Sequence, residues 1–218
     1  MFKKSEIWAI VVAGGDGRRF GAKKQFLDLK GINVLERSVS AARSVASHVV
    51  AVVPLSALEN ESLHGGADIV VAGGADRAAS VRAGLVVVPE STSVIIVHDA
   101  ARPLASQELF SRVIDALDEG IDGVVPGIAV TDTVKRVQNN LVLETLDRAE
   151  LIAVQTPQAF RARALRLAHQ SGQSATDDAS LIEIGGGVIA VVAGESRNIK
   201  LTEPSDVDVA LGYIDETE

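Results

Sequence analysis

The chain has 218 residues, 47% of them hydrophobic, so it is long enough to bury the core of one domain or at most two small ones. Acidic residues outnumber basic ones by 29 to 21, and the resulting net charge of -8 argues against a non-specific nucleic-acid binder, which normally carries a basic face. The chain has no cysteine, which excludes disulfides and thiolate metal sites.

The first segment, MFKKSEIWAIVVAGG, combines two lysines with a short apolar run. It resembles a signal peptide only faintly, because the run ends in Gly-Gly-Asp-Gly-Arg-Arg without a small-residue cleavage pattern. No stretch of the chain approaches the roughly 20 apolar residues that a membrane-spanning helix needs. We therefore expect a cytoplasmic protein with no membrane partner.

Short, β-branched apolar runs recur along the chain and predict buried strands. They lie at 7–13, 48–53, 68–72, 93–100, 122–127 and 188–194. Such runs, bounded by Gly, Pro or charged residues, suit the strands of a parallel sheet that is covered on both faces. Helical patterns at 32–46, 76–88 and 106–119 lie between them. The alternation predicts an α/β fold with a mostly parallel twisted sheet and right-handed connections, in a single domain over 1–218.

The loop after the first strand carries four cations, Arg18, Arg19, Lys23 and Lys24. A dinucleotide fingerprint fails here because Phe20 occupies its third glycine position, and a P-loop fails because neither lysine precedes Ser or Thr. A glycine-rich loop at the open end of a parallel sheet brings backbone N–H groups close to an anion. Its cations could neutralise a triphosphate, and the alternative is a solvated turn whose charges only aid solubility.

The sequence VHDAARP at 97–103 places polar residues at the end of a buried strand. Asp99 is a candidate Mg²⁺ ligand, because magnesium takes only one or two protein carboxylates besides water and phosphate oxygens. Arg102 is then placed to reach a second anionic group. Alternatively, His98 is a hydrogen-bonded scaffold residue and Asp99 a helix cap, although Ser106 suits the cap of the following helix better. The basic loop and this carboxylate together indicate metal-assisted transfer from a nucleoside triphosphate.

The segment 133–148 breaks the alternation. Asn139-Asn140 lies between β-rich residues, which predicts a hairpin with a tight turn. An isolated hairpin is marginally stable in water, so it should pack against something, and a partner subunit is one candidate. Farther along, Thr176-Asp177 either caps a helix or contacts a substrate.

Eight ordered motifs extend over nearly the whole chain. They are AGGDGRRFGAKKQF (13–26), GGADRAASVRAGL (73–85), VHDAARP (97–103), TDTVKR (131–136), TLDR (145–148), QTPQAF (155–160), ATDDAS (175–180) and RNIKLT (197–202). With these motifs the chain resembles the 2-C-methyl-D-erythritol 4-phosphate cytidylyltransferases of the non-mevalonate isoprenoid pathway. The resemblance implies a Rossmann-like nucleotidyltransferase fold with a protruding β-hairpin arm over 131–150.

The resemblance also implies roles for individual residues. Arg19 and Lys24 look like the pair that contacts the CTP phosphates, and Asp99 like the Mg²⁺ ligand. The nucleotide-binding wall that it implies consists of Ala13, Gly14, Gly15, Gly17, Gly74 and Ser80. The residues that it implies for the methylerythritol phosphate are Arg102, Thr133, Arg148, Thr176 and Lys200. Lys200 also looks catalytic, whereas Thr133 and Arg148 belong to an arm that in the family completes the partner's site, which implies a homodimer.

The implied reaction is attack by the acceptor phosphate on the α-phosphorus of CTP, which expels pyrophosphate. Two alternatives remain: transfer to another polyol phosphate such as ribitol 5-phosphate, or a nucleotide-binding regulatory module without turnover. The combination of Arg19, Lys24 and Asp99 favours an enzyme. Ala75 departs from the family pattern, in which an acidic residue commonly follows the glycine pair, so any carboxylate contact to the nucleotide at that position is lost.

Overall fold

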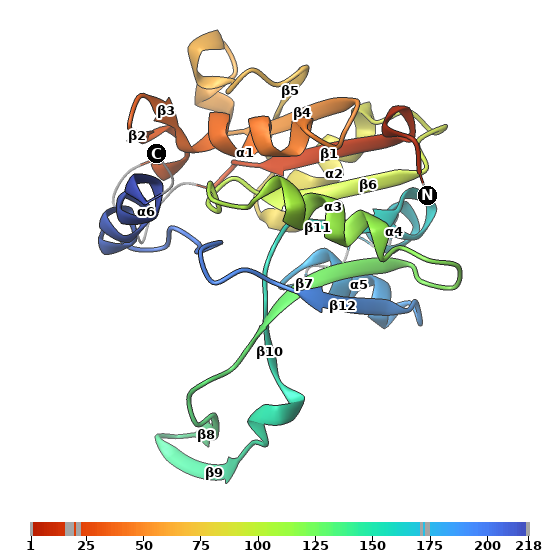
Figure 1. Ribbon diagram of the computed structural model, residues 1–218. Helices are drawn as coiled ribbons and strands as arrows, with labels where there is room; N and C mark the ends of the chain where they lie inside the picture. Colours follow the sequence, from red (N-terminus) through yellow and green to blue (C-terminus); the bar gives the residue numbers. More distant parts are fainter. Residues whose placement is uncertain (1, 16–19, 21–22, 171, 173–174, 217–218) are drawn as a thin grey trace.

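The structure is a computed structural model that describes residues 2–15, 20, 23–170, 172 and 175–216. An eight-stranded sheet runs through it in the order β10-β7-β11-β6-β1-β4-β5, with β12 paired to β7 (Figure 1). Its strands are β1 (Ile7–Val12), β4 (His48–Val53), β5 (Ile69–Ala72), β6 (Val94–Asp99), β7 (Gly123–Ala129), β10 (Ile152–Val154), β11 (Gln158–Arg161) and β12 (Ile189–Ala193). The six apolar runs of the sequence are thus all strands, as predicted.

Strands β5, β4, β1 and β6 are parallel to one another. The chain builds outward from β1 through β4 to β5 and then returns to β6 on the other side of β1. The carboxyl ends of β1 and β6 therefore flank a topological switch point, which is where open α/β sheets bind ligands. The residues of β6 are all buried, in keeping with a strand that is covered on both faces.

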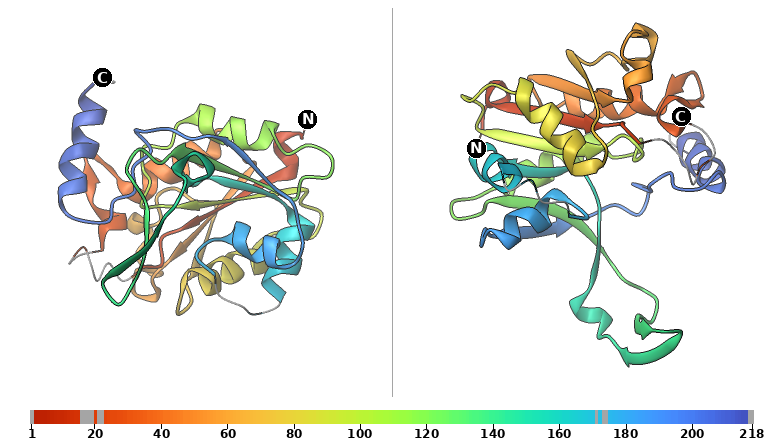
Figure 2. Two further views of the ribbon diagram at one scale, coloured as in Figure 1. Left: turned by 90° about the horizontal axis from the view of Figure 1, so that it is seen from below. Right: turned by 180° about the vertical axis from the view of Figure 1, so that it is seen from behind.

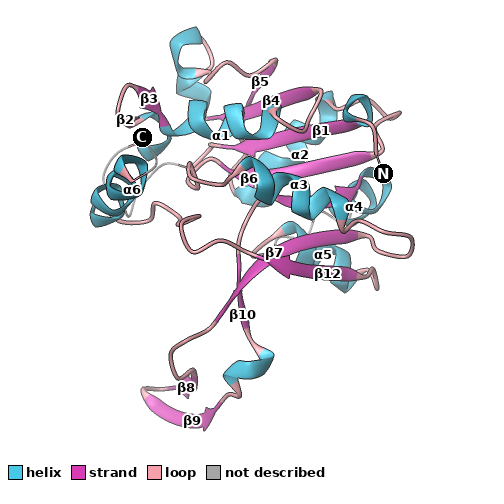
Figure 3. Cartoon of the chain, in the orientation of Figure 1, coloured by secondary structure: helices cyan, strands magenta, loops and turns pink. Residues whose placement is uncertain are grey.

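Helices cover both faces of the sheet (Figures 2 and 3). Helices α1 (Val34–Arg43) and α3 (Gln107–Asp115) contribute to one core cluster, together with Ala9 and Val11 of β1. Helices α2 (Arg77–Val87), α4 (Ala162–Gln170) and α5 (Asp178–Ile184) contribute to the other cluster, together with Trp8 and Ile10. Alternate residues of β1 thus enter opposite cores, as the period of a strand requires.

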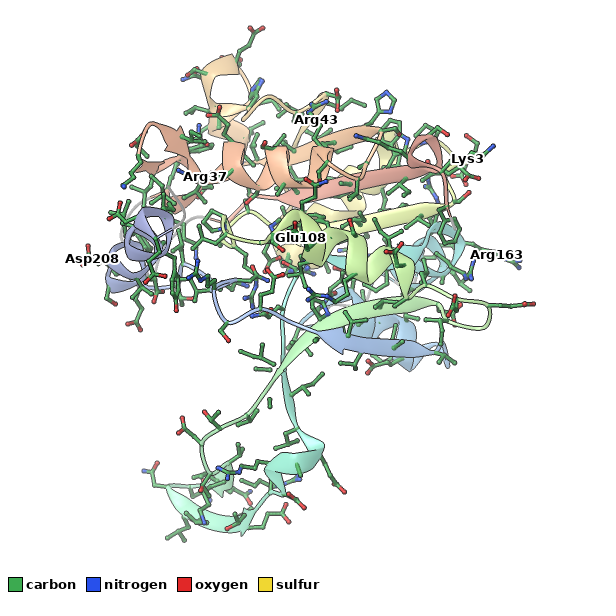
Figure 4. The ribbon with its side chains drawn as sticks, viewed as in Figure 1. Lys3, Arg37, Arg43, Glu108, Arg163 and Asp208 are labelled. Carbon is green, nitrogen blue, oxygen red and sulfur yellow. The ribbon has the colours of Figure 1, made fainter. Side chains whose placement is uncertain are left out.

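The C-terminal helix α6 (Ser205–Asp215) packs beside the small sheet of β2 (Asp28–Leu29) and β3 (Ile32–Asn33), where Leu29, Leu201 and Ile214 share a third apolar cluster. Charged side chains such as Lys3, Arg163 and Asp208 lie exposed on the periphery (Figure 4). No helix in the described ranges is long and apolar enough to cross a bilayer.

The predicted hairpin consists of β8 (Lys135–Gln138) and β9 (Leu141–Thr145), and it projects away from the sheet (Figure 1). The turn residues Asn139 and Asn140 have φ angles of 50° and 63°. Asparagine tolerates this left-handed region better than most residues, so the Asn-Asn pair suits a tight turn whose twist matches the strands. The protruding arm expected from the sequence is confirmed as a feature of the fold.

Two strands of the eight-stranded sheet have no counterpart in the sequence interpretation. Strand β11 inserts between β6 and β7 and is antiparallel to both, and β10 pairs antiparallel with β7. Strand β10 has only three residues, and β11 (QAFR) has no β-branched residue, so neither forms an apolar run like those that reveal the parallel strands. The sheet is therefore mixed at this side and parallel at its centre.

Candidate functional site

A cavity of about 420 Å³ opens at the switch point between β1 and β6. The end of β1, the residues after the glycine loop, the start of α2, the tip of β6 and one residue of the C-terminal segment all border it. The lining residues are Val12, Ala13, Gly14, Gly15, Lys24, Gln25, Gly74, Ala75, Asp76, Arg77, Ser80, Asp99, Ala100, Ala101 and Lys200. The fold thus brings together residues from five separate segments that the sequence motifs singled out.

Asp99 is the last residue of β6 and receives two cations. Its Oδ1 accepts a hydrogen bond from Arg77 Nε at 3.0 Å, and its Oδ2 accepts one from Lys200 Nζ at 2.6 Å. Burial acts to raise the pKa of Asp99, but the charges and hydrogen bonds of Arg77 and Lys200 outweigh burial and hold this pKa well below the usual aspartate value. Asp99 is therefore an ionised carboxylate, and it caps no helix.

The glycines at the cavity wall permit a close backbone approach. A Cβ on Gly14 would lie 3.1 Å from Ser80 Oγ, and a Cβ on Gly74 would lie 2.4 Å from the Cβ of Ala79. Ser80 Oγ accepts a hydrogen bond from Gly74 N and donates one to the carbonyl of Asp76. The wall is therefore built of packed peptide groups, which suits a flat or anionic group that must approach the backbone.

The two lysines after the glycine loop point in different directions. Lys24 lines the cavity, and its Nζ donates to the carbonyl of Leu201 at 2.5 Å. Lys23 Nζ instead donates to Ser56 Oγ. Of the four predicted loop cations, Arg18 and Arg19 lie outside the described residues, as does Gly17 of the predicted nucleotide-binding wall.

Arg102 lies beside the cavity but does not line it. Its guanidinium donates to the carbonyl of Asn198 at 2.7 Å and to that of Val154 at 3.4 Å. Burial lowers the pKa of Arg102, and the negative charge of Asp99 opposes this change. Arg102 therefore connects the base of the arm with the segment that carries Lys200.

Three further substrate-binding candidates also lie away from the cavity. Thr133 and Arg148 are exposed on the arm, where the Arg148 guanidinium donates to the carbonyl of Thr131. Thr176 is exposed before α5, whereas the next residue, Asp177, accepts a hydrogen bond from Ser180 N and caps that helix. The helix-capping interpretation is thus confirmed for Asp177. A single copy of the chain does not bring Arg102, Thr133, Arg148 and Thr176 into the cavity.

His98 is a scaffold residue, as the sequence suggested. It is fully buried, its Nδ1 lies 3.1 Å from Thr156 Oγ1, and its Nε2 lies 3.2 Å from the carbonyl of Arg102. Burial lowers the pKa of His98 to about 4, so the ring is neutral near pH 7. Since a carbonyl only accepts, Nε2 carries the proton and Nδ1 accepts from the Thr156 hydroxyl. That hydroxyl in turn accepts from Asp99 N at 3.0 Å, which fixes the backbone at the tip of β6.

The carboxylates of the cavity fit a metal that arrives together with phosphate groups. No cluster of three or more His, Cys, Asp or Glu side chains occurs among the residues that the structure describes. Of the two aspartates that line the cavity, Asp76 uses Oδ1 to cap α2 at Ala79 N, whereas the carboxylate of Asp99 contacts the charged side chains of Arg77 and Lys200. One carboxylate, completed by water and phosphate oxygens, is a normal environment for Mg²⁺ but not for zinc.

The sequence interpretation missed Arg77 as a site residue. Arg77 is the first residue of α2, and its Nη1 donates to Asp178 Oδ2 at 2.7 Å while its Nε holds Asp99. Burial acts to lower the pKa of Arg77, but the two carboxylates outweigh it and raise this pKa above the usual arginine value. The sequence pattern that could have indicated Arg77 is an arginine three positions after a glycine pair at the end of a strand.

Comparisons with known proteins give one consistent result. The family model described as 2-C-methyl-D-erythritol 4-phosphate cytidylyltransferase matches residues 7–216. A protein of that description from Carboxydothermus hydrogenoformans is 40% identical over 220 residues, which cover 94% of each chain. The bifunctional enzyme IspD/IspF of Nitratidesulfovibrio vulgaris is 42% identical over 92% of this chain but only 56% of its own, so this chain spans about half the length of that relative.

Solved structures agree with the sequence comparison. The crystal structure of 4-diphosphocytidyl-2C-methyl-D-erythritol synthase from Anaerococcus prevotii superposes with a TM-score of 0.84 at 27% identity, over 98% of this chain and all of that one. The 2-C-methyl-D-erythritol 4-phosphate cytidylyltransferase from Thermus thermophilus gives a TM-score of 0.80 at 31% identity, over 94% of this chain and 97% of that one. The mixed α/β architecture is therefore that of these nucleotidyltransferases.

Proposed function

The chain belongs to the family of 2-C-methyl-D-erythritol 4-phosphate cytidylyltransferases, and we propose that it transfers a cytidylyl group from CTP to 2-C-methyl-D-erythritol 4-phosphate. A phosphate oxygen of the acceptor forms a bond to the α-phosphorus of CTP, and the bond from that phosphorus to the bridging oxygen breaks. Pyrophosphate leaves, and 4-diphosphocytidyl-2-C-methyl-D-erythritol forms as a precursor for isoprenoid biosynthesis.

The observation that carries this proposal is the convergence of Lys24, Arg77 and Lys200 with Asp99 in one cavity at the carboxyl ends of β1 and β6. Both reactants are anions, so the obstacles are to bring them together and to stabilise the charge that accumulates on the phosphoryl oxygens. Fixed cations in a partly enclosed cavity meet both needs. Here Lys24 and Lys200 would contact the phosphates, together with Arg19 from the glycine loop.

The reaction needs neither a covalent nucleophile nor a strong general base, because a phosphate monoester is already ionised near pH 7. The only histidine close to the cavity, among the described residues, is His98, whose two ring nitrogens contact Thr156 and the carbonyl of Arg102. It supports the tip of β6 and takes no proton from the acceptor. The residues near the cavity therefore suit a cytidylyl transfer that depends on positioning of the reactants and on stabilisation of charge.

We assign nucleotide recognition to Ala13, Gly14 and Gly15, which follow β1, and to Gly74 and Ser80 at the start of α2. The close packing of these segments supports the assignment, since a side chain on Gly74 would collide with Ala79. Gly17 belongs to the same loop in the sequence. Since residue 75 is alanine, recognition at that position is limited to its peptide group.

Asp99 would hold Mg²⁺ together with the triphosphate of CTP. When bound, the metal withdraws charge from the phosphoryl oxygens to which it binds. The support is the chemistry of the donor: Asp99 is an ionised, largely buried carboxylate at the edge of the cavity. Lys200, whose side chain is 43% exposed, is then available to turn from Asp99 toward the substrate phosphate.

We further propose that the enzyme is a cytoplasmic homodimer in which the arm over 131–150 completes the site of the partner subunit. Large apolar side chains on the arm are exposed, among them Leu141 at 69% and Val142 at 61%. A second copy would cover them, since adjacent exposed apolar side chains typically mark an interaction site. Thr133 and Arg148 would then join Arg102, Thr176 and Lys200 around the acceptor. A nucleoside triphosphate substrate is available in the cytoplasm.

Pyrophosphate release from CTP tests the proposed function. Methylerythritol phosphate and ribitol 5-phosphate are offered separately as acceptors, with and without Mg²⁺. We expect release that depends on CTP, on Mg²⁺ and on methylerythritol phosphate, with a much lower kcat/KM for ribitol phosphate. Preference for ribitol phosphate would identify the alternative transferase. CTP binding without pyrophosphate release from any acceptor would identify a regulatory module.

A further inference from the structure

A chain of alternating charges leads from the cavity into the interior of the protein. Lys200 contacts Asp99, Asp99 contacts Arg77, and Arg77 contacts Asp178. The far carboxylate oxygen of Asp178, Oδ1, lies 2.8 Å from His169 Nε2. The exposed fraction of the side chain is 43% at Lys200, 12% at Asp99, 23% at Arg77 and 1% at Asp178. The cavity end of the path is therefore open to solvent, whereas its inner end is buried.

We propose that Arg77 is a positioning residue that fixes the Asp99 carboxylate in the nucleotide site, and that Asp178 and His169 fix Arg77 in turn. The proposal rests on the function proposed above and adds residues that act on the nucleotide through Asp99. Arg77 and Asp178 do so from the first turns of α2 and α5, and His169 from the end of α4.

Arg77 is better suited to this task than Lys200. Lysine carries one ammonium group on a flexible stem, whereas the planar guanidinium of arginine offers several N–H groups in a fixed fork. Arg77 uses Nε for Asp99 and Nη1 for Asp178, so its orientation is determined by two carboxylates at once. When Lys200 turns toward a substrate phosphate, Arg77 still holds one oxygen of Asp99 and leaves the other for a metal.

Helix capping does not explain the burial of Asp178. The cap of α5 is already supplied by Asp177, which accepts from Ser180 N at 3.0 Å. Asp178 is 1% exposed, and a carboxylate of such low exposure needs partners, since burial of an unpaired charge is strongly unfavourable. Its partners are Arg77 and His169, together with the favourable position of an anion in the first turn of a helix. Asp178, itself held by His169, therefore fixes the guanidinium of Arg77.

The test compares Arg77→Gln and Arg77→Lys with the control Arg166→Gln. Arg166 is a similarly covered arginine, with an 18% exposed side chain, and it holds the same helix at its other end through the carbonyls of Leu85 and Val88. Steady-state kinetics is combined with calorimetric titration of CTP into each full-length variant, once with Mg²⁺ and once with EDTA. Thermal unfolding of each variant records its stability.

We expect Arg77→Gln to lower both kcat and the Mg²⁺-dependent gain in CTP affinity by about 10- to 100-fold, as for residues that orient metal ligands. CTP binding in EDTA should change little, because Arg77 acts through Asp99. Arg77→Lys keeps the charge but not the fork, so it should recover only part of the loss. Arg166→Gln should resemble the wild type in both titrations. An equal loss of affinity with Mg²⁺ and with EDTA would overturn the proposal.

Two further variants keep the test decisive. If Arg77→Gln does not fold, Asp178→Asn weakens the hold on Arg77 without touching Asp99, and it should reduce the Mg²⁺-dependent gain in the same direction. In the Asp99→Asn background, Arg77→Gln should have almost no further effect on that gain; independent, multiplied effects would contradict the mechanism. A wild-type protein that binds CTP and Mg²⁺ but releases no pyrophosphate refutes the proposed function while leaving this binding test intact.

Discussion

The Nζ atom of Lys200 lies 2.6 Å from Oδ2 of Asp99, although 101 positions separate the two residues in the chain. The contact joins the segment before α6 to the tip of β6. Asn198 stabilises the same junction. Its side-chain amide donates to the backbone carbonyl of Thr156 at 2.9 Å, and its backbone carbonyl accepts from Arg102. The C-terminal part of the chain is thus a structural component of the site.

Lys24→Ala should lower turnover far more than it weakens CTP binding. The lysine lines the cavity, and charge on the phosphoryl oxygens is greatest in the transition state, so we expect a loss of about 100-fold or more in kcat. Lys23→Ala is a matched control, because Lys23 contacts Ser56 instead. Steady-state kinetics and CTP titrations distinguish the two effects. A loss confined to CTP affinity would contradict a role in the transition state.

Mixed dimers should recover activity if the arm completes the site of the partner. Arg148→Ala and Arg19→Ala homodimers are each expected to be nearly inactive. After subunit exchange, half of the dimers are mixed and each has one intact site, so activity should return to about a quarter of the wild-type value. Differently tagged subunits allow purification of the mixed species. If the purified mixed dimers stay inactive, each subunit builds its site alone.

His98 should make the protein less stable as the pH falls. Burial lowers its pKa from 6.5 to about 4, so between these values the unfolded chain binds a proton that the folded protein excludes. The free energy of unfolding should therefore fall from pH 6.5 to pH 4, by about 3 kcal/mol from this residue, and be insensitive to it at higher pH. Urea titrations of wild type and His98→Gln at pH 7 and pH 4.5 measure how much His98 contributes to the pH dependence of the free energy of unfolding. Equal pH dependence of both proteins would show that His98 does not cause it.

The same substitution should have opposite effects at two helical glycines. In α2, a Cβ on Gly84 would lie 2.7 Å from Cγ2 of the buried Ile10, so Gly84→Ala should destabilise the protein by about 1–3 kcal/mol. In α6, a Cβ on Gly212 meets no atom within 4 Å, so Gly212→Ala should stabilise it by about 0.5–1 kcal/mol through helix propensity. Denaturant unfolding of both variants shows whether each substitution raises or lowers the free energy of unfolding. Stabilisation by Gly84→Ala would mean that Ile10 can move aside.

The sequence predicted those parts of the fold whose residues follow a local rule. The parallel strands are continuous β-branched runs, and the pair Asn139-Asn140 is typical of a tight turn, so the strands and the hairpin turn were predicted. Strand β11 is a strand because β6 and β7 offer free edges on either side of it, which only the tertiary structure provides. The basic glycine loop and the strand tip indicated Lys24 and Asp99, and the resemblance to a family added Lys200. The role of Arg77 depends on Asp178, which lies 101 positions away, and no local pattern reveals such a pair.

The insertion of β11 beside β6 has a consequence for the protein during its synthesis. Residues 94–97 pair on one side with β1, which is already made, but their other side waits for residues 158–161. A ribosome-bound chain that ends between β6 and β11 therefore presents an open edge of apolar strand, which is a template for association with other nascent chains.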